Sequence, residues 1–237
     1  MLRSPVNAQE ARGTARNPII WADVPDPSVI RVGHTFYMSS TTMHMNPGVP
    51  IMKSQDLVNW QIVNYVYNIL GDDDRQTLSN GQSEYGRGSW ASSLVYHKGT
   101  FYVAFSSQTS GRTFVFHTQD IENGPWKKSA MEFTHDMSLL FDDDGRVYLA
   151  YGGGDIRLVE LTADATAMKK GGVNQVIIAN SSAIAGPNIA LPAEGAHLHK
   201  IGGKYYIFLI TWPKGGMRTQ LCYRADHITG PYEGRVV

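Results

Sequence analysis

Short runs of alternating apolar and polar residues dominate this chain, and glycines separate the runs. The stretch from Thr100 to Phe105 shows the alternation that is typical of a strand with one buried face. Helical periodicity extends over no more than a turn or two, and residues 163–172 fit either a short helical turn or a loop. The pattern therefore predicts an all-β protein built from many short strands.

A three-part unit recurs four times along the sequence. An apolar run is followed by a glycine turn with an aromatic strand, and then by a further strand that usually ends in a turn with an aromatic residue. The turn glycines recur at a variable spacing of about 50 residues, which is typical of propeller blades with loop insertions. They are Gly33, Gly99, Gly145 and Gly203. We therefore predict a β-propeller over residues 17–237. Its four blades are expected at approximately 17–70, 71–130, 131–185 and 186–237.

Three acidic residues stand at equivalent points of this repeat. Asp26, Asp136 and Glu194 each open an apolar run that leads into a glycine turn, and Trp90 holds the matching place in the second unit. Because the first strand of each blade lines the channel of a propeller, these four residues are expected to ring one end of its axis. One acidic residue at a strand start is usually a solvated turn residue. Three at matched positions favour a shared site, and converging carboxylates are what glycosidic bond cleavage requires.

Other candidate sites in the sequence have simpler explanations. The Asp-Gly end of residues 142–145 is typical of a hairpin turn, and its spacing lacks a calcium-loop ligand ladder. Residues 72–74 (three Asp) fit an exposed loop tip. The glycines at 152–154 fit a tight bend or bulge, because no helix follows to cradle a phosphate. His197 and His199 share a strand face without a third metal ligand, so His197 is expected to be a hydrogen-bonded channel residue.

Composition narrows the partners and the cellular location. Lys+Arg and Asp+Glu both number 21, so the net charge is zero, which argues against nucleic acid or an anionic membrane as partner. The one cysteine, Cys222, forms no internal disulfide, and no apolar run is long enough to span a membrane. Residues 1–16 lack the apolar region of a signal peptide. They are expected to be a flexible lead-in or the remnant of a removed signal, which leaves secreted, periplasmic and cytoplasmic locations open.

Four motifs together resemble glycoside hydrolase family 43. They are residues 23–28 (DVPDPS), 53–60 (KSQDLVNW), 89–91 (SWA) and 193–198 (AEGAHL). Residues 43–50 (MHMNPGVP) are most similar to the β-xylosidase and α-L-arabinofuranosidase branch of that family rather than to the arabinanases. The resemblance covers the chain from about Asn17 to its last residue, and it implies a five-bladed β-propeller, in agreement with the repeat.

The resemblance also implies a role for each carboxylate. Asp26 is expected to be the general base, Glu194 the general acid, and Asp136 the residue that orients the acid and raises its pKa. The family inverts the anomeric carbon, which requires base and acid about 6.5–9.5 Å apart so that a water fits between them.

The same resemblance implies that Trp90, Ala91 and Met43 wall the sugar pocket and that His44 lies close by. Blade packing is the alternative explanation for Trp90. No metal or other cofactor is expected in the chemistry, and a structural calcium ion, although compatible with the fold, is not indicated by the sequence.

The chain departs from the family pattern in length and at the third motif. Met137 follows Asp136 where the family often has proline. Four blade units are visible, whereas the family's fifth blade supplies a histidine near the channel and an arginine at the sugar pocket; no residue of this chain was assigned to either. An open ring would expose two blade edges, so association of copies through those edges is one hypothesis.

The sequence thus predicts an inverting glycosidase that removes terminal β-1,4-xylosyl or α-L-arabinofuranosyl residues from xylan-derived oligosaccharides or arabinoxylan. Two alternatives come from other functional classes. One is a truncated propeller that binds carbohydrate with little or no turnover. The other is a structural propeller that binds protein partners, for which sugar binding would be absent.

Overall fold

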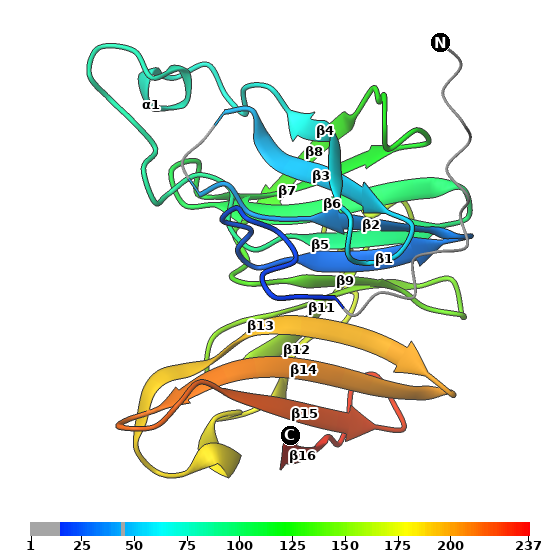
Figure 1. Cartoon of the computed structure of the whole chain (residues 1–237). Helices are drawn as coiled ribbons and strands as arrows, with labels where there is room; N and C mark the ends of the chain where they lie inside the picture. Colours follow the sequence, from blue (N-terminus) through cyan, green and yellow to red (C-terminus); the bar gives the residue numbers. More distant parts are fainter. Residues whose placement is uncertain (1–14, 44–45) are drawn as a thin grey trace.

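The computed structural model describes residues 15–43 and 46–237, and strands dominate those ranges (Figure 1). Sixteen strands are assigned within the described residues. In the first and second sheets they are β1 Ser28–Val32, β2 Thr35–Ser39, β3 Gly48–Ser54, β4 Gln61–Tyr67, β5 Ser93–His97, β6 Thr100–Ser107, β7 Arg112–Thr118 and β8 Lys127–Glu132. In the third and fourth they are β9 Ser138–Phe141, β10 Val147–Tyr151, β11 Ile156–Leu161, β12 Asn174–Ile178, β13 Ile189–Ile201, β14 Lys204–Pro213, β15 Thr219–Ala225 and β16 Glu233–Val236.

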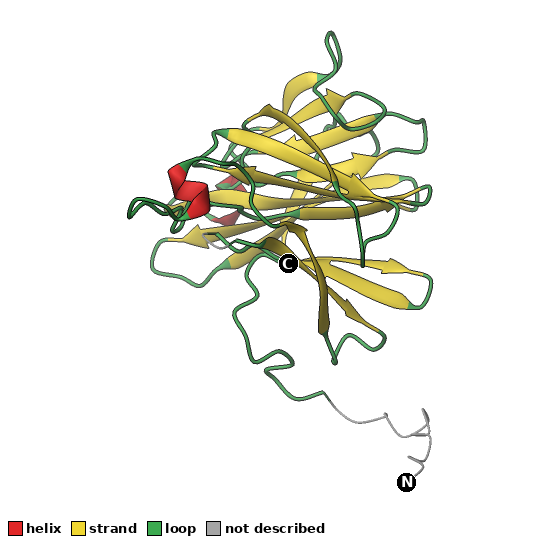
Figure 2. Ribbon diagram, turned by 90° about the horizontal axis from the view of Figure 1, so that it is seen from above, coloured by secondary structure: helices red, strands yellow, loops and turns green. Residues whose placement is uncertain are grey.

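Each set of four consecutive strands forms one antiparallel sheet, so the strand order in space follows the order in sequence. We call these sheets blades one to four. The first strands of neighbouring blades pack together, β1 with β5, β5 with β9 and β9 with β13. Figure 2 shows the strands from above, at right angles to the view of Figure 1. The predicted all-β fold with four blade units is confirmed.

A glycine with positive φ stands in the turn between the first and second strands of every blade. Gly33, Gly99, Gly145 and Gly203 have φ values between 60° and 83°. Glycine reaches this region without a Cβ penalty, and in blades one, two and four the strands reverse over two residues, whereas five residues separate β9 from β10. The repeated glycines therefore set the reversal that starts each blade.

Apolar clusters fill the spaces between consecutive blades. Val49 and Ile51 of blade one pack with Phe105 of blade two. Equivalent clusters join blade two to blade three, through residues such as Val115 and Leu149, and blade three to blade four. Since burial of apolar surface is the main favourable term in folding, these clusters hold the inner strands in register around the site.

Outside the strands, residues 15–43 and 46–237 form loops and two very short helices. The helix α1 covers Asp74–Thr77 and the 3₁₀-helix η1 covers Ala183–Ala185. Residues 163–172 form a loop, which decides between the two predicted alternatives. The Asp-Gly hairpin turn is confirmed, because Gly145 N donates to Asp142 O at 3.1 Å. No helix among the described residues is long and apolar enough to cross a membrane.

Blades one and four each carry exposed large apolar side chains. Val29 and Ile62 of blade one are 45% and 54% exposed, and Trp212 of blade four is 42% exposed. Association of copies through the blades at the two ends of the sheet series stays a prediction. The predicted N-terminal segment 1–16 lies almost wholly outside the described residues.

Candidate active site

A cavity of about 400 Å³ lies where all four blades contribute residues. Three of the segments that lead into first strands reach it, those before β1, β5 and β9, and blade four contributes β13, β14 and the start of β15. The lining residues that bear on the chemistry are Asp26, Ala91, Ser92, Asp136, Glu194, His197, Phe208, Arg218 and Gln220. The structure therefore brings the three predicted carboxylates together in one cavity.

Asp26 and Asp136 reach the cavity with the same unusual backbone conformation. Their φ values are 49° and 47°, in the left-handed region that aspartate enters more readily than most residues. Each lies two residues before a first strand, β1 or β9. Strained backbone of this kind is concentrated at functional sites. The matched φ values show that the sequence repeat extends to the local geometry of these two carboxylates.

Glu194 reaches the cavity in a different way. It was expected at the head of the first strand of blade four, but it lies inside β13, which begins five residues earlier at Ile189. The pairing of β13 with β14 shifts register on both sides of Glu194, and Gly195 has a φ of 67°. Such irregularities are typical of β-bulges, which redirect a side chain next to an active site. The bulge therefore places Glu194 at the cavity, as the left-handed backbone places the two aspartates there.

Hydrogen bonds link Asp136 and Glu194 through their neighbours. The backbone N–H of Gly195 donates to Asp136 Oδ2 at 3.1 Å. His135 Nε2 lies 3.0 Å from Glu194 Oε2 and 3.7 Å from Asp136 Oδ2. His135 carries no sequence signal for this role, because its position one residue before Asp136 does not indicate a contact 59 residues away. The site therefore contains an imidazole as well as three carboxylates.

The charges of the site influence one another. Loss of solvation and then the charge of Glu194 raise the pKa of Asp26, while Arg218 opposes them. Burial raises the pKa of Asp136, and the charges of Glu194 and Asp26 add to that increase against the opposing effect of His135. Mutual influence of this kind requires the three carboxylates to lie within electrostatic reach of one another. Perturbed groups that share a cavity are typical of a functional site.

The donor atoms of His135, Asp136 and Glu194 form a compact group. One donor atom from each lies within 4.8 Å of the others, and this is the one such group found among the described residues. His197 and His199 are not part of it, although their rings stack at a centroid distance of 6.4 Å. The prediction that no metal takes part in the chemistry stays a prediction.

The predicted sugar-pocket residues lie close to the carboxylates with different degrees of contact. Ala91 and His197 line the cavity. Trp90 is half-buried, and its ring stands edge-on to His135 at 5.6 Å between centroids. Met43 does not line the cavity, but its N–H donates to Ser89 O at 2.9 Å, which fixes it to the segment before Trp90. His44 lies outside the described residues.

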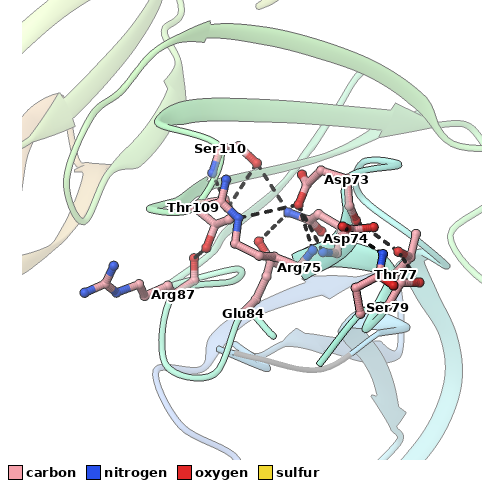
Figure 3. A network of polar contacts seen from close by, with 12 residues as sticks. Asp73, Asp74, Arg75, Thr77, Ser79, Glu84, Arg87, Thr109 and Ser110 are labelled. Carbon is pink, nitrogen blue, oxygen red and sulfur yellow. Dashed lines mark hydrogen bonds and ion pairs between the residues drawn. The ribbon is translucent and has the colours of Figure 1, made fainter. Parts of the chain in front are cut away.

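A network of polar contacts, buried at Gln76 and Glu84, joins α1 to the loop that precedes Trp90 (Figure 3). Asp73 caps α1 by accepting from Arg75 N and Gln76 N, and the side-chain amide of Gln76 donates to buried Glu84. Arg87 N then donates to Glu84 O at 2.7 Å. Residues 72–74, predicted as an exposed loop tip, thus also include the N-cap and the first residue of α1, which the sequence did not indicate. Glu84 therefore links α1, through the Gln76 side chain, to the backbone of Arg87, three residues before Trp90.

An arginine and a glutamine from blade four complete the lining. Arg218 lies just before β15 and Gln220 lies within it. The Arg218 guanidinium carbon also lies 5.5 Å from the centroid of the Trp212 ring. No arginine of this chain was predicted for the sugar pocket, because the family resemblance places that residue in a fifth blade. The structure supplies Arg218 as a cation at the cavity, where it influences Asp26.

Comparisons with known proteins agree with this geometry. Residues 15–236 match the protein family described as Glycosyl hydrolases family 43. The chain is 32% identical to a beta-xylosidase of Formosa agariphila, over 95% of this chain and 41% of that protein. It is 31% identical to the non-reducing end alpha-L-arabinofuranosidase BoGH43B of Bacteroides ovatus, over 96% of this chain and 41% of that protein. The chain thus spans about two fifths of the length of these curated relatives.

Solved structures show the same similarity. A bifunctional GH43-CE protein of Bacteroides eggerthii superimposes with a TM-score of 0.91 at 55% identity, over 94% of this chain and 29% of that one. The GH43 protein BlXynB of Bacillus licheniformis superimposes with a TM-score of 0.74 at 28% identity, over 92% of this chain and 42% of that one. The propeller arrangement is therefore shared with solved members of one family.

Proposed function

Because the chain belongs to glycosyl hydrolase family 43, we propose that its four-blade cavity hydrolyses glycosidic bonds with Asp26 as general base and Glu194 as general acid. Asp136 orients the acid and favours its protonated form. The observation that carries this proposal is the convergence of three carboxylates, each from a different blade, on one cavity of about 400 Å³. Their matched places in the repeat and the perturbed pKa values of Asp26 and Asp136 support it.

The proposed reaction is a single displacement at the anomeric carbon. Asp26 accepts a proton from a water molecule, and the oxygen of that water attacks from the face opposite the leaving group. Glu194 donates a proton to the glycosidic oxygen as the bond between that oxygen and the anomeric carbon breaks. The N–H of Gly195 holds Asp136 beside the acid. The product sugar has the inverted configuration.

We propose terminal β-1,4-xylosyl or α-L-arabinofuranosyl residues of xylan-derived oligosaccharides or arabinoxylan as the substrate. Relatives named as beta-xylosidase and as non-reducing end alpha-L-arabinofuranosidase support this choice at similar identity. The half-buried ring of Trp90 offers an aromatic wall beside the carboxylates, and aromatic faces are suited to packing on the apolar face of a sugar. Arg218 and Gln220 supply hydrogen-bond donors to sugar hydroxyl groups.

The protein is expected to hydrolyse a nitrophenyl β-xyloside, a nitrophenyl α-L-arabinofuranoside or both. Release of nitrophenol measures turnover, and proton NMR of the first-formed sugar identifies its anomer. Inversion is the expected result. Retention of configuration would contradict the water-mediated mechanism, and binding of xylo-oligosaccharide without hydrolysis of any substrate would favour the carbohydrate-binding alternative.

A further inference from the structure

His135 lies close to both the proposed acid, Glu194, and the neighbouring carboxylate of Asp136. Its Nε2 atom is 3.0 Å from Glu194 Oε2 and 3.7 Å from Asp136 Oδ2, and its side chain is 32% exposed. The ring is held from the other side by the edge-on contact with Trp90. The imidazole of blade three therefore forms a direct hydrogen bond with a carboxyl group of blade four.

The glycine bend at residues 152–154 fixes this pair through the backbone. Gly152 N donates to His135 O, and Gly154 N donates to Ala193 O, both at 2.9 Å. A Cβ atom on Gly153 would lie 3.6 Å from His135 Cδ2 and 4.0 Å from Glu194 Oε2, so the bend lies against both side chains. The bend was predicted from sequence, but its two partners were not. The bend is hydrogen-bonded to the backbone of His135 and to that of Ala193, the residue just before Glu194. The relative position of His135 and Glu194 therefore depends on the backbone as well as on their side chains.

Charged groups, two anionic and one cationic, surround the pair from three elements. Asp136 lies on the same segment as His135, Asp26 comes from blade one, and the Arg218 guanidinium comes from the start of β15 and acts on Asp26. The hydrogen bond with Glu194 raises the pKa of His135 against the opposing effect of burial, and the charges of Asp136 and Glu194 raise it further. These surroundings favour keeping one proton on the pair.

We propose that His135 is a positioning residue for Glu194 and that the two hydrogen-bonded side chains share one proton. The acid of the site is then the pair rather than an isolated carboxyl group. This inference rests on the proposed function for the role of Glu194. In turnover, the shared proton ends on the leaving-group oxygen, which also keeps the electron pair of the broken bond. The proton from the attacking water ends on Asp26, and solvent restores the starting state.

A proton NMR titration tests the shared proton without any substrate. The chain has eight histidines, and the signal that disappears in His135→Gln identifies His135. In the unmodified protein, His135 is expected to titrate above the usual imidazole value of about 6.5. In Glu194→Gln its midpoint is expected to fall by about one pH unit or more, because the main hydrogen-bond partner has lost its charge. Equal midpoints in the two proteins would overturn the proposal.

The pH dependence of kcat/KM tests the same pair during turnover. Gln at position 135 keeps a hydrogen-bond donor near the place of Nε2 but does not titrate. Because the ordinary pKa values of imidazole and glutamate differ by about 2 units, the basic limb in His135→Gln is expected to move to lower pH by about one unit or more, with KM nearly unchanged. His135→Phe keeps a ring but loses the hydrogen bond, so its kcat is expected to fall at every pH.

His34→Gln is the matched control, because His34 is exposed in the first turn of blade one. Its pH profile is expected to coincide with that of the unmodified protein. An unmoved basic limb in His135→Gln would overturn the shared proton. Absence of hydrolysis by the unmodified protein would instead contradict the proposed function, and the NMR titration would still decide whether the pair shares a proton.

Discussion

Asp26→Asn is expected to lower kcat by roughly 10³-fold on every glycoside that the unmodified protein hydrolyses, whereas the loss in Glu194→Gln depends on the leaving group. Asparagine cannot accept the proton of the attacking water, and every substrate needs that water. Glutamine cannot protonate a leaving oxygen, and only a basic leaving group needs that proton. We therefore expect Glu194→Gln to lose roughly 10³-fold on an oligosaccharide but less than about tenfold on a dinitrophenyl glycoside.

The measurement is kcat for both variants on an oligosaccharide, a nitrophenyl glycoside and a dinitrophenyl glycoside. Asp23→Asn is the control, because Asp23 is an exposed carboxylate that acts on Asp26 through charge but does not line the cavity. It is expected to stay within about threefold of the unmodified protein, since an exposed charge is well screened. If Glu194→Gln loses the same factor on all three substrates, Glu194 is not the proton donor to the leaving group.

The blades could be predicted from sequence because their signals are local. Gly33 and its three equivalents stand in the reversals between first and second strands, and a short turn depends on the few residues around it. Asp26 and Asp136 repeat the same position before a first strand and the same positive φ. Since identical local sequence roles gave identical local geometry, the repeat was enough to place both aspartates at the cavity.

The contacts between blades could not be predicted in the same way. The hydrogen bond between His135 and Glu194 joins residues 59 positions apart, and it depends on the bulge in β13 and on the bend at residues 152–154. The register shifts around Glu194 leave no periodic signal in the sequence, and the glycines at 152–154 indicated a bend but not its partners. Arg218 reaches the cavity because β15 pairs with β14, which is again a tertiary relation. The three carboxylates could therefore be predicted from sequence, whereas His135 and Arg218, which act on them, became evident only in the folded structure.

Asp142 is expected to be the most costly single charge to remove outside the cavity. Its side chain is 2% exposed and accepts hydrogen bonds from Lys200 Nζ and Tyr205 Oη, each at 2.5 Å. These two partners lie on β13 and β14, so the carboxylate joins blade three to blade four. Removing one partner of a buried pair leaves the other without its charge or hydrogen bond. Lys200 is 21% exposed and can still reach Asp143, which moderates the loss.

We therefore expect Asp142→Asn to destabilise the fold by about 2 kcal/mol. For a chain of this size, that corresponds to a fall in Tm of roughly 6 °C at neutral pH. Asp143→Asn is the matched control, because Asp143 also lies 2.9 Å from Lys200 but its side chain is 86% exposed. An exposed ion pair contributes about 0–1 kcal/mol, so the control is expected to lose less than about 3 °C.

The pH dependence of the difference identifies its electrostatic origin. Burial acts to raise the pKa of Asp142, but the hydrogen bonds from Lys200 and Tyr205 outweigh it and hold that pKa below the ordinary value of 3.8. A carboxyl group with a lowered pKa in the folded state stabilises the fold above its unfolded value and loses that contribution as the pH falls through the folded value. The Tm gap between the unmodified protein and Asp142→Asn is therefore expected to be equal at pH 7 and pH 6 and to shrink below about pH 3.8. A gap that is unchanged down to pH 2.5, or equal losses in Asp142→Asn and Asp143→Asn, would show that the carboxylate charge is not what joins the two blades.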